Sequence, residues 1–366
     1  MEKILQQIIA QIMPADAEAV RRAEERQASL AKPPGSLGKL EEISVKFAGI
    51  TGKVINEPKK TRLVVFAADN GVAEEGVSSA PQSVTLSQTI NLTRGITGAS
   101  ALAAHVGSEV EVVDVGVLTD VGCAAVFNRK VAYGTNNIRR GAAMTRDQAL
   151  CAMLTGVEFA DKAAEDGVDI AGCGEMGIGN TTTTAAVLCV LTGKSAAEIA
   201  GKGGGITQEA YLKKIAVIDD AIALNAPDPK NVVEILAKVG GFDLCAMTGF
   251  FLGCAKNRIP VVVDGIISIV AALAAMRMQE NVKDFLFLSH RSFEKGYDTA
   301  ARELGLKEYL DMDMRLGEGS GCPLMFQVIS AACAVMKNMA TFAQAAINDD
   351  YLEEIRVGDC FTVSEE

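Results

Sequence analysis

The sequence of 366 residues predicts an α/β fold in which helices cover both faces of a parallel sheet, together with a small helical domain. Short apolar runs alternate with helical stretches along the middle of the chain. Each run is apolar without interruption, which is typical of parallel strands buried on both faces. Both ends of the chain show helical periodicity instead, so we expect them to form the small domain together.

The N-terminal region predicts two helices. Residues 2–28 are expected to form the first, because isoleucine and leucine recur on one stripe between residues 4 and 12. The segment Lys32–Gly38 (KPPGSLG) interrupts it, since proline disfavours helical conformations before it and glycine frees φ. A second helix is expected from Lys39 to Gly49.

Five apolar runs predict the strands. The run Arg62–Ala68 (RLVVFAA) is the first, and it ends at Asp69-Asn70-Gly71. Such runs are rich in Val, Ile and Leu and are bounded by turn residues, as strands are. Further strands are expected at residues 109–117, 168–173, 259–263 and 285–288.

The domain division follows from these elements. The apolar pattern of Leu324–Ile347 predicts a C-terminal helix. We therefore expect a large α/β domain over residues 55–323. The small helical domain would combine residues 1–54 with 324–366.

Composition and charge argue against several classes of function. A net charge of −11 is unsuited to a protein that binds a nucleic-acid backbone. With nine cysteines, no C-x-x-C pair and only two histidines, we expect no metal site. Scattered free cysteines are typical of a cytoplasmic protein. The longest apolar runs, Gly265–Met276 and Leu324–Met336, are shorter than the roughly 20 residues that span a bilayer, so we expect no membrane segment.

The segment Val168–Thr184 (VDIAGCGEMGIGNTTTT) is the most informative part of the chain. A strand ends, a glycine-rich loop follows, and a helix opens with Asn180 or Thr181 as its N-cap. A helix start offers unpaired N–H groups and the positive end of the helix dipole, which suit a phosphate. The alternative is an ordinary glycine-rich connection between a strand and a helix.

Two nucleotide-binding motifs can be tested against this segment. Gly172-x-Gly174-x-x-Gly177 matches the dinucleotide pattern, which would make the chain a dinucleotide-dependent oxidoreductase. That pattern needs an acidic residue at the end of a second strand, but the candidate, Glu198, stands in a predicted turn and helix. The P-loop pattern fails at Gly193-Lys194-Ser195, because Leu188 stands where its first glycine is required.

A second candidate is the carboxylate of Glu318, within Met314–Gly321 (MRLGEGSG). Glycines on both sides let a ligand approach it closely. Partial burial would raise the pKa of this carboxyl and make it a base near neutral pH. The alternative is a surface turn.

Other candidates are individually weaker. Asp69-Asn70-Gly71 and Asp264-Gly265 each follow a strand at the edge where open α/β sheets bind ligands, but each is as often a plain turn. Lys213 follows a run of three glycines that begins at Gly203, and it could pair with a phosphate or be solvated. Ser289-His290-Arg291 follows the last strand, and a single histidine there is more often structural than catalytic.

Several segments together resemble one family, the nicotinate-nucleotide–dimethylbenzimidazole phosphoribosyltransferases of cobalamin nucleotide-loop assembly. They occur in order and cover most of the chain from about residue 30 to residue 345. The matching segments are KPPGSLGKLE (32–41), ADNGVAEEGVSSAPQ (68–82), GEMGIGNTTTTAA (174–186), KVGGFDLCAMTG (238–249), PVVVDG (260–265), LSHRSFEKG (288–296) and MRLGEGSG (314–321).

The resemblance implies a reaction and an architecture. Nicotinate mononucleotide and 5,6-dimethylbenzimidazole, or a related aromatic base, would give α-ribazole 5′-phosphate and nicotinate, with no cofactor. The large domain would be Rossmann-like, the small one would come from both termini, and the protein would be a homodimer.

The resemblance also implies roles for individual residues. Glu318 would be the catalytic base, and Glu175 would support the oxocarbenium-like ribose. The aromatic base would lie against Ala80, Gln88, Met176 and Leu316. The nucleotide and its phosphate would be held by Gly177, Ile178, Gly179, Asn180, Thr181, Thr182, Gly203, Lys213 and Ser289.

Two departures bear on the substrate. Asn70 stands where the family often has histidine, and Ala80 stands where some members have serine. Some relatives act on phenolic bases or adenine, and some of those work as a heterodimer of two paralogues. A non-catalytic partner subunit is therefore an alternative, although the retained Glu175 and Glu318 argue against it.

Overall fold

The computed structural model describes residues 1–353 and 355, and it divides the chain into two compact units. The larger unit contains residues 1–14 and 59–326, and the smaller contains residues 15–58 and 327–366. The expected division differs from these units in residues 1–14 and 324–326, which group with the larger unit, and in residues 55–58, which group with the smaller one. The first helix of the larger unit, α1 (Glu2–Ala10), buries Leu5 and Ile8.

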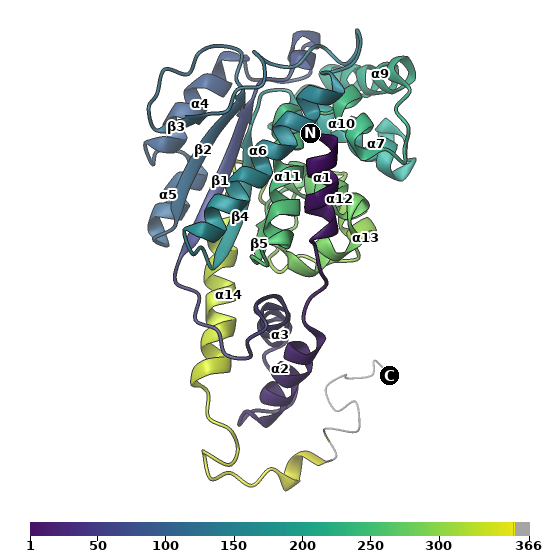
Figure 1. Ribbon diagram of the computed structural model, residues 1–366. Helices are drawn as coiled ribbons and strands as arrows, with labels where there is room; N and C mark the ends of the chain where they lie inside the picture. Colours follow the sequence, from purple (N-terminus) through teal and green to yellow (C-terminus); the bar gives the residue numbers. More distant parts are fainter. Residues whose placement is uncertain (354, 356–366) are drawn as a thin grey trace, which may run out of the picture. The chain divides into compact units, whose positions relative to one another are not determined.

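The larger unit is built on a six-stranded parallel sheet, which confirms the predicted fold class (Figure 1). The strand order is β3-β2-β1-β4-β5-β6, so the chain reverses its direction of travel between β1 and β4. Ligands of open α/β sheets bind at such a switch point, outside the carboxyl ends of the strands. The strands are β1 (Thr61–Ala68), β2 (Glu109–Gly116), β3 (Val126–Asn128), β4 (Ile170–Met176), β5 (Val261–Val263) and β6 (Leu286–Leu288).

Two strands differ most from the prediction. The sequence carries no signal for β3, because it is three residues long and two of them, Phe127 and Asn128, are exposed. The strand predicted at 168–173 extends to Met176, because β1 pairs with it up to Ala67 opposite Met176. As a consequence Glu175 stands on a strand and not in a flexible loop.

Helices cover both faces of the sheet. Figure 1 shows α4 (Ser83–Thr93) and α5 (Gly98–His105) on one side of β1 and β2, with α6 (Arg146–Glu165) and α11 (Phe242–Lys256) on the other. The remaining helices of this unit are η1 (Gly71–Glu75), α7 (Asn180–Thr192), α8 (Ala196–Ile199), α9 (Gln208–Asn225), α10 (Val232–Val239), α12 (Ile266–Met278), η2 (Glu280–Phe285) and α13 (Tyr297–Leu304).

The helices α6 and α11 touch backbone to backbone. A Cβ atom on Gly156 would lie 1.8 Å from the Ala246 carbonyl oxygen, and one on Gly249 would lie 1.8 Å from the Met153 carbonyl oxygen. No side chain fits at either position. These two glycines therefore fix how closely the helices approach.

The predictions at the chain ends need correction. Residues 2–28 are not one helix, because the chain breaks at Pro14 and restarts with α2 (Ala17–Ser29). The Asp16 carboxylate caps α2 by accepting N–H bonds from its first turn at 3.0 Å. The C-terminal helix α14 (Gly321–Asn338) starts three residues earlier than predicted and ends well before residue 347.

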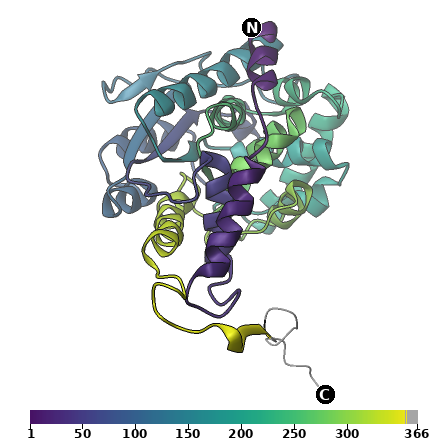
Figure 2. The ribbon, with the colours of Figure 1, turned by 60° about the horizontal axis from the view of Figure 1, so that its bottom comes forward.

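The smaller unit packs α2 against α3 (Lys39–Thr51), and the two lie side by side in Figures 1 and 2. Ala23, Ala48 and Met336 form a small buried cluster in it, and η3 (Asp350–Leu352) follows later in the chain. The end of the predicted small domain, residues 354 and 356–366, lies outside the described residues. No helix in the described part of the chain is long and apolar enough to cross a membrane.

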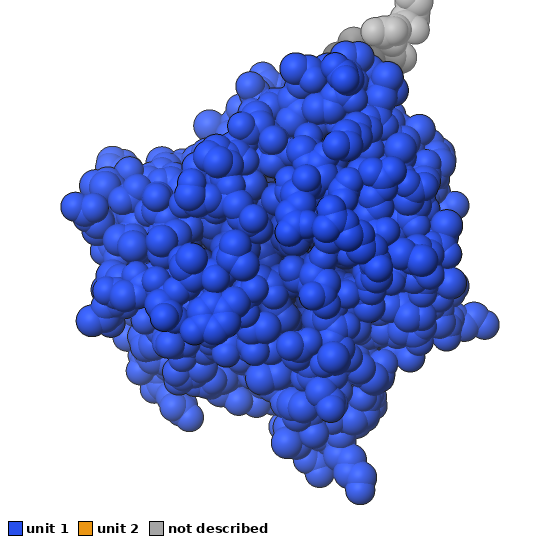
Figure 3. All heavy atoms as spheres, turned by 90° about the horizontal axis from the view of Figure 1, so that it is seen from above, with its two compact units in different colours: residues 1–14, 59–326 blue, residues 15–58, 327–366 orange. Residues whose placement is uncertain are grey.

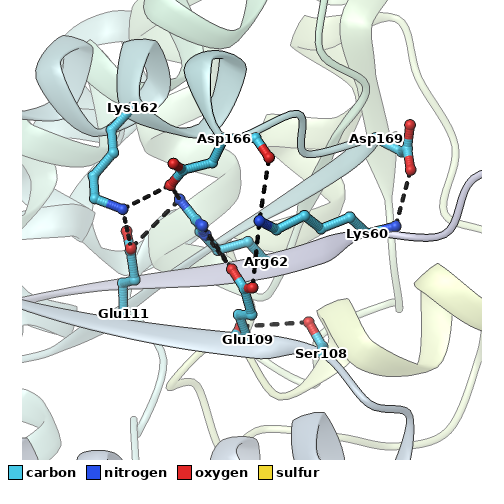
Figure 4. Close-up of polar contacts among 8 residues, drawn as sticks. All are labelled: Lys60, Arg62, Ser108, Glu109, Glu111, Lys162, Asp166 and Asp169. Atoms are coloured by element: carbon cyan, nitrogen blue, oxygen red, sulfur yellow. Dashed lines mark hydrogen bonds and ion pairs between the residues drawn. The ribbon is translucent and has the colours of Figure 1, made fainter.

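An ion network lies at the amino ends of β1 and β2, at the opposite end of the strands from the switch point (Figure 4). Arg62 is buried at its centre and contacts Glu109 at 2.6 Å and Asp166 at 2.8 Å. Lys162 contacts Asp166 at 2.8 Å and Glu111 at 2.7 Å. These contacts lower the pKa of Asp166 to about 2, the Lys162 hydrogen bond first and the Arg62 hydrogen bond next.

Candidate active site

A pocket of about 190 Å³ opens at the carboxyl ends of β4, β5 and β6 in the larger unit, which Figure 3 shows from above. Its walls come from segments far apart in the sequence. They are residues 77–80, the end of β4 with the start of α7, residues 202–206, the residues after β5 and β6, and residues 315–317. The switch point of the sheet therefore holds a cavity.

Glu318 is held beside this pocket in an unusual backbone conformation. Its φ is +62°, and Gly317 and Gly319 have φ of +85° and +83°. The side chain is buried, and its carboxylate accepts hydrogen bonds from Gln88 Nε2 at 3.3 Å and from the Ala99 N–H at 3.2 Å. Ala99 lies in the first turn of α5, where the helix dipole favours an anion.

Glu175 faces Glu318 from β4. Its Oε1 accepts the N–H of Glu318 at 3.4 Å, and its Oε2 accepts a hydrogen bond from Asn180 Nδ2. The same Asn180 amide donates to Asp243 Oδ2 at 3.0 Å. The carboxyl groups of Glu175 and Asp243 therefore share one amide donor.

Burial changes the protonation of this pair. Glu175 is 7 % exposed, and burial followed by the nearby charge of Asp243 raises its pKa to about 8. Burial also raises the pKa of Asp243, to about 6. Near neutral pH, Glu175 is thus mostly protonated and Asp243 mostly ionised.

The helix start differs from the prediction. The N-cap of α7 is Gly179, with φ of +93°, and not Asn180 or Thr181. The Asn180 side chain is directed to the carboxyl groups instead. The amides of Ile178, Asn180 and Thr182 are engaged, by Thr85 Oγ1, the Gly177 carbonyl and the Gly179 carbonyl respectively. Within the described part of the chain, the amides of Gly179 and Thr181 have no such acceptor.

Neither Lys213 nor Lys214 lines the pocket, but Lys214 contacts this helix start. Lys214 is 1 % exposed, and its Nζ donates to Thr181 Oγ1 at 2.9 Å. Burial lowers its pKa to about 8, and the nearby Glu294 partly opposes this shift. Gly203 lies close by, since a Cβ atom there would be 3.1 Å from Thr181 Oγ1.

The other predicted residues fall into two groups. Ala80, Met176 and Leu316 line the pocket, as do Gly177, Ile178, Gly179, Asn180, Thr181 and Gly203. Gln88, Thr182 and Ser289 do not line it. Gln88 supports Glu318, Thr182 is buried, and Ser289 Oγ lies 3.0 Å from His290 Nδ1.

Three buried polar residues at the site were not predicted from the sequence or were given too little weight. Asp264, weighed as a weak candidate, accepts N–H bonds from Gly319 at 3.1 Å and from Gly321 at 2.7 Å. Asp243 lies within the family-like segment KVGGFDLCAMTG and could have been found there. His290 lines the pocket directly after β6, and its position after a strand was the available signal.

The dinucleotide interpretation does not fit this geometry. Gly172 and Gly174 lie inside β4, not in a turn before a helix. A Cβ atom on Gly172 would lie 2.7 Å from Cys322 Cβ, and one on Gly174 would lie 2.4 Å from the Glu318 carbonyl oxygen. These glycines admit close packing of α14 and of the loop before it, not a pyrophosphate.

The arrangement can bind an anion, hold a flat ring and remove a proton. The helix start with Lys214 suits a phosphate. The apolar walls at Met176 and Leu316 suit an aromatic ring, and Glu318 can accept a proton. The described residues include no group of three or more side chains suited to a metal ion.

Comparisons with known proteins agree on one family. A family model described as "Phosphoribosyltransferase" matches residues 12–347. The nicotinate-nucleotide–dimethylbenzimidazole phosphoribosyltransferase of Clostridium tetani is 49% identical over 355 residues, which are 97% of this chain and 98% of that protein. The protein of the same name from Geobacter sulfurreducens is 43% identical over 350 residues, 95% of this chain and 99% of its own.

A solved structure agrees as well. The crystal structure of the nicotinate-nucleotide–dimethylbenzimidazole phosphoribosyltransferase from Thermus thermophilus matches with a TM-score of 0.86 and 36% identity. The match covers 91% of this chain and 99% of that one. The likeness therefore extends over almost the whole length of both proteins.

Proposed function

Because the chain belongs to the nicotinate-nucleotide–dimethylbenzimidazole phosphoribosyltransferases, we propose that it transfers the 5-phosphoribosyl group of nicotinate mononucleotide to 5,6-dimethylbenzimidazole. The products are α-ribazole 5′-phosphate and nicotinate. The observation that carries this proposal is the meeting of Glu318, Glu175 and the start of α7 at one pocket, in a chain that matches these relatives along nearly its full length.

The chemistry needs little acid or base assistance. The bond from the ribose C1′ to the pyridinium nitrogen breaks, and its electron pair neutralises the ring, so the leaving group needs no proton. A nitrogen lone pair of the incoming base forms the new bond from the opposite face, which inverts C1′ and gives the α product. The remaining N–H proton of the incoming base is the only one to remove.

Glu318 is suited to remove that proton. Gln88 and the Ala99 amide hold its carboxylate from two sides and leave other lone pairs free. A general base contributes about 10²–10⁴-fold, whereas alignment of two reactants supplies roughly 7–11 kcal/mol. Most of the acceleration should therefore come from alignment, which the closely packed backbone around Glu318 favours.

Glu175 would respond to the cationic donor. In the free protein it is mostly protonated near neutral pH, because its pKa is about 8. The positive pyridinium ring, and then the positive charge that develops on the ribose, would favour its carboxylate form. We assign it the role of stabilising that charge.

The 5′-phosphate would lie at the start of α7. The amides of Gly179 and Thr181 face no acceptor in the described residues, and Lys214 stands next to Thr181. We therefore assign the lysine of the phosphate site to Lys214 in place of Lys213. Gly203 borders the same corner of the pocket.

The aromatic base would lie between Ala80, Met176 and Leu316. An apolar pocket separates similar shapes weakly, by only about 10–200-fold per methylene. Ala80 brings no hydroxyl, and Gln88 is engaged by Glu318. We expect benzimidazoles to be preferred and at least one further aromatic base to be accepted.

We also propose a cytoplasmic homodimer. The eight cysteines in the described residues are all free, which suits a reducing compartment. A heterodimer with a paralogue is the alternative, and the retained carboxylates at the pocket favour a catalytic chain. Light scattering of the chain purified alone, combined with its activity, separates the two.

The direct test supplies the purified chain with nicotinate mononucleotide and a panel of dimethylbenzimidazole, benzimidazole, adenine and p-cresol. Product masses identify which bases receive phosphoribose. Turnover of dimethylbenzimidazole is the expected result, and no product from any base would refute the proposal. Turnover of dimethylbenzimidazole alone would refute only the broad base range.

A further inference from the structure

The loop that carries Glu318 has three consecutive residues in the left-handed region of backbone conformation. Gly317 and Gly319 adopt it without steric cost, but Glu318, with φ of +62°, does not. A non-glycine residue keeps such a conformation only where its surroundings hold it there. Some contact must therefore fix this loop.

Glu175 accepts the Glu318 N–H at 3.4 Å, and Asp264, which follows β5, holds the loop directly after Glu318. Its Oδ2 accepts the Gly319 N–H at 3.1 Å, and its Oδ1 accepts the Gly321 N–H at 2.7 Å. The two bonds hold the first and the third residue after Glu318. Charge-assisted bonds of this kind are among the stronger hydrogen bonds in proteins, and Gly321 begins α14, where the helix dipole adds to them.

Asp264 is itself anchored to the sheet. It is 3 % exposed, and its N–H donates to Ser268 Oγ at 3.1 Å. Ser268 Oγ in turn donates to the Cys173 carbonyl of β4 at 3.2 Å. His290 Nδ1 lies 3.8 Å from Asp264 Oδ1 and supplies a polar neighbour on its other side. The anchor is thus rigid relative to β4, on which Glu175 stands.

We propose that Asp264 is a positioning residue that sets the place of the Glu318 carboxylate through the loop backbone. This inference rests on the proposed role of Glu318 as the base. It predicts that damage to Asp264 slows the proton-removing step and leaves binding of the nucleotide almost unchanged, because the phosphate site belongs to α7.

The first variant is Asp264→Asn. Its amide keeps one acceptor oxygen, so one of the two loop N–H groups faces an NH₂ group. Misplacement by about 1 Å can cost about 10²-fold in rate, and we expect kcat to fall on that order. The Kd of nicotinate mononucleotide, measured by calorimetry, should stay within about threefold. A Kd that rises as much as kcat falls would mean that Asp264 binds the substrate, which overturns the inference.

The matched control is Asp114→Asn. Asp114 is also buried and follows the same pattern, because its Oδ1 accepts N–H bonds from Gly116 at 3.1 Å and from Val117 at 2.8 Å at the end of β2. Unlike Asp264, it does not line the pocket. A similar loss of melting temperature with near wild-type kcat is expected of it. An equal loss of kcat in both variants would reduce Asp264 to a structural role.

A double-mutant cycle with Glu318→Gln tests the route of the effect. In single-turnover reactions with excess protein, Asp264→Asn should change the residual rate of Glu318→Gln by less than about threefold. If the rate losses of the two single variants add in the double variant, the positioning role of Asp264 is overturned, but the role of Glu318 as the base is not. Wild-type turnover in Glu318→Gln itself would instead overturn the assigned base. If Asp264→Asn fails to fold, Asp264→Glu keeps the charge, shifts it by one methylene, and should still lower kcat but not affinity.

Discussion

Binding of nicotinate mononucleotide should exchange protons with water, and the direction of exchange should reverse with pH. Glu175 and Lys214 both have a pKa of about 8. Protonated Glu175 is neutral, whereas protonated Lys214 carries a positive charge. The cationic ring favours ionised Glu175, and the phosphate favours charged Lys214. One group therefore releases a proton on binding while the other takes one up.

The magnitudes follow from these pKa values. Two unit charges 4 Å apart interact by about 4 kcal/mol at an effective dielectric constant of about 20, which is about 3 pKa units. That is enough to move either group to one form. At pH 7, Glu175 would release about 0.9 proton and Lys214 would take up about 0.1, a net release of about 0.8. The net exchange vanishes near pH 8 and becomes an uptake of about 0.8 at pH 9.

The assay is titration calorimetry at pH 7, 8 and 9 in two buffers with different ionisation enthalpies. The slope of the observed heat against that enthalpy gives the protons exchanged. Glu175→Gln should leave only an uptake that grows with pH, and Lys214→Met only a release that declines with pH. An exchange with the same sign at pH 7 and pH 9, or one unaltered by Glu175→Gln, would refute the reasoning.

Three further outcomes are expected. Glu318→Gln should keep the wild-type melting temperature and lose roughly 10²–10⁴ in kcat, and near wild-type turnover would rule out its role as the base. Nicotinate mononucleotide should bind far more tightly than its dephosphorylated riboside, because the start of α7 would lose its anion; equal Kd values by calorimetry would contradict this. Lys162→Gln should move the acid-unfolding midpoint, followed by circular dichroism, to higher pH. The pKa of Asp166 is depressed, so its ionised form stabilises the fold above about pH 3.8, and this contribution is lost as pH falls to about 2. An unchanged midpoint would argue against a stabilising contact between Lys162 and Asp166.

The fold was predictable because most of its strands lie within short apolar runs that are separated by helical stretches. The run at residues 62–68 became β1 almost residue for residue. The sequence could not reveal β3, whose pairing with β2 comes from the neighbouring strand and not from its own three residues. Pro14 should have ended the first helix, and the periodicity on either side of it concealed that signal.

Residues of the candidate site could be predicted where they belong to a recognisable sequence motif. They were harder to predict where only the three-dimensional structure brings them to the site. The family was inferred from matching segments that occur in order along the chain, and the comparisons confirm it. The adjacent lysines at 213 and 214 cannot be told apart from the sequence. Lys214 is buried because it lies on the face of α9 that packs against the protein. The proposed role of Asp264 is equally hidden, since its partners are backbone amides about 55 residues further along the chain.

The strand order has a consequence for synthesis on the ribosome. Thr61 of β1 pairs with Ile170 of β4, so one of the two neighbouring strands of β1 is synthesised much later than β1 itself. The loop of Glu318 lies against both strands, because a Cβ atom on Gly319 would lie 2.5 Å from Leu63 Cδ1 of β1 and 3.1 Å from Gly174 Cα of β4. The segment that completes the pocket is thus among the last to leave the ribosome, and it docks on the earliest strand. A nascent chain that stops before residue 318 lacks Glu318, so the candidate site is completed only near the end of translation.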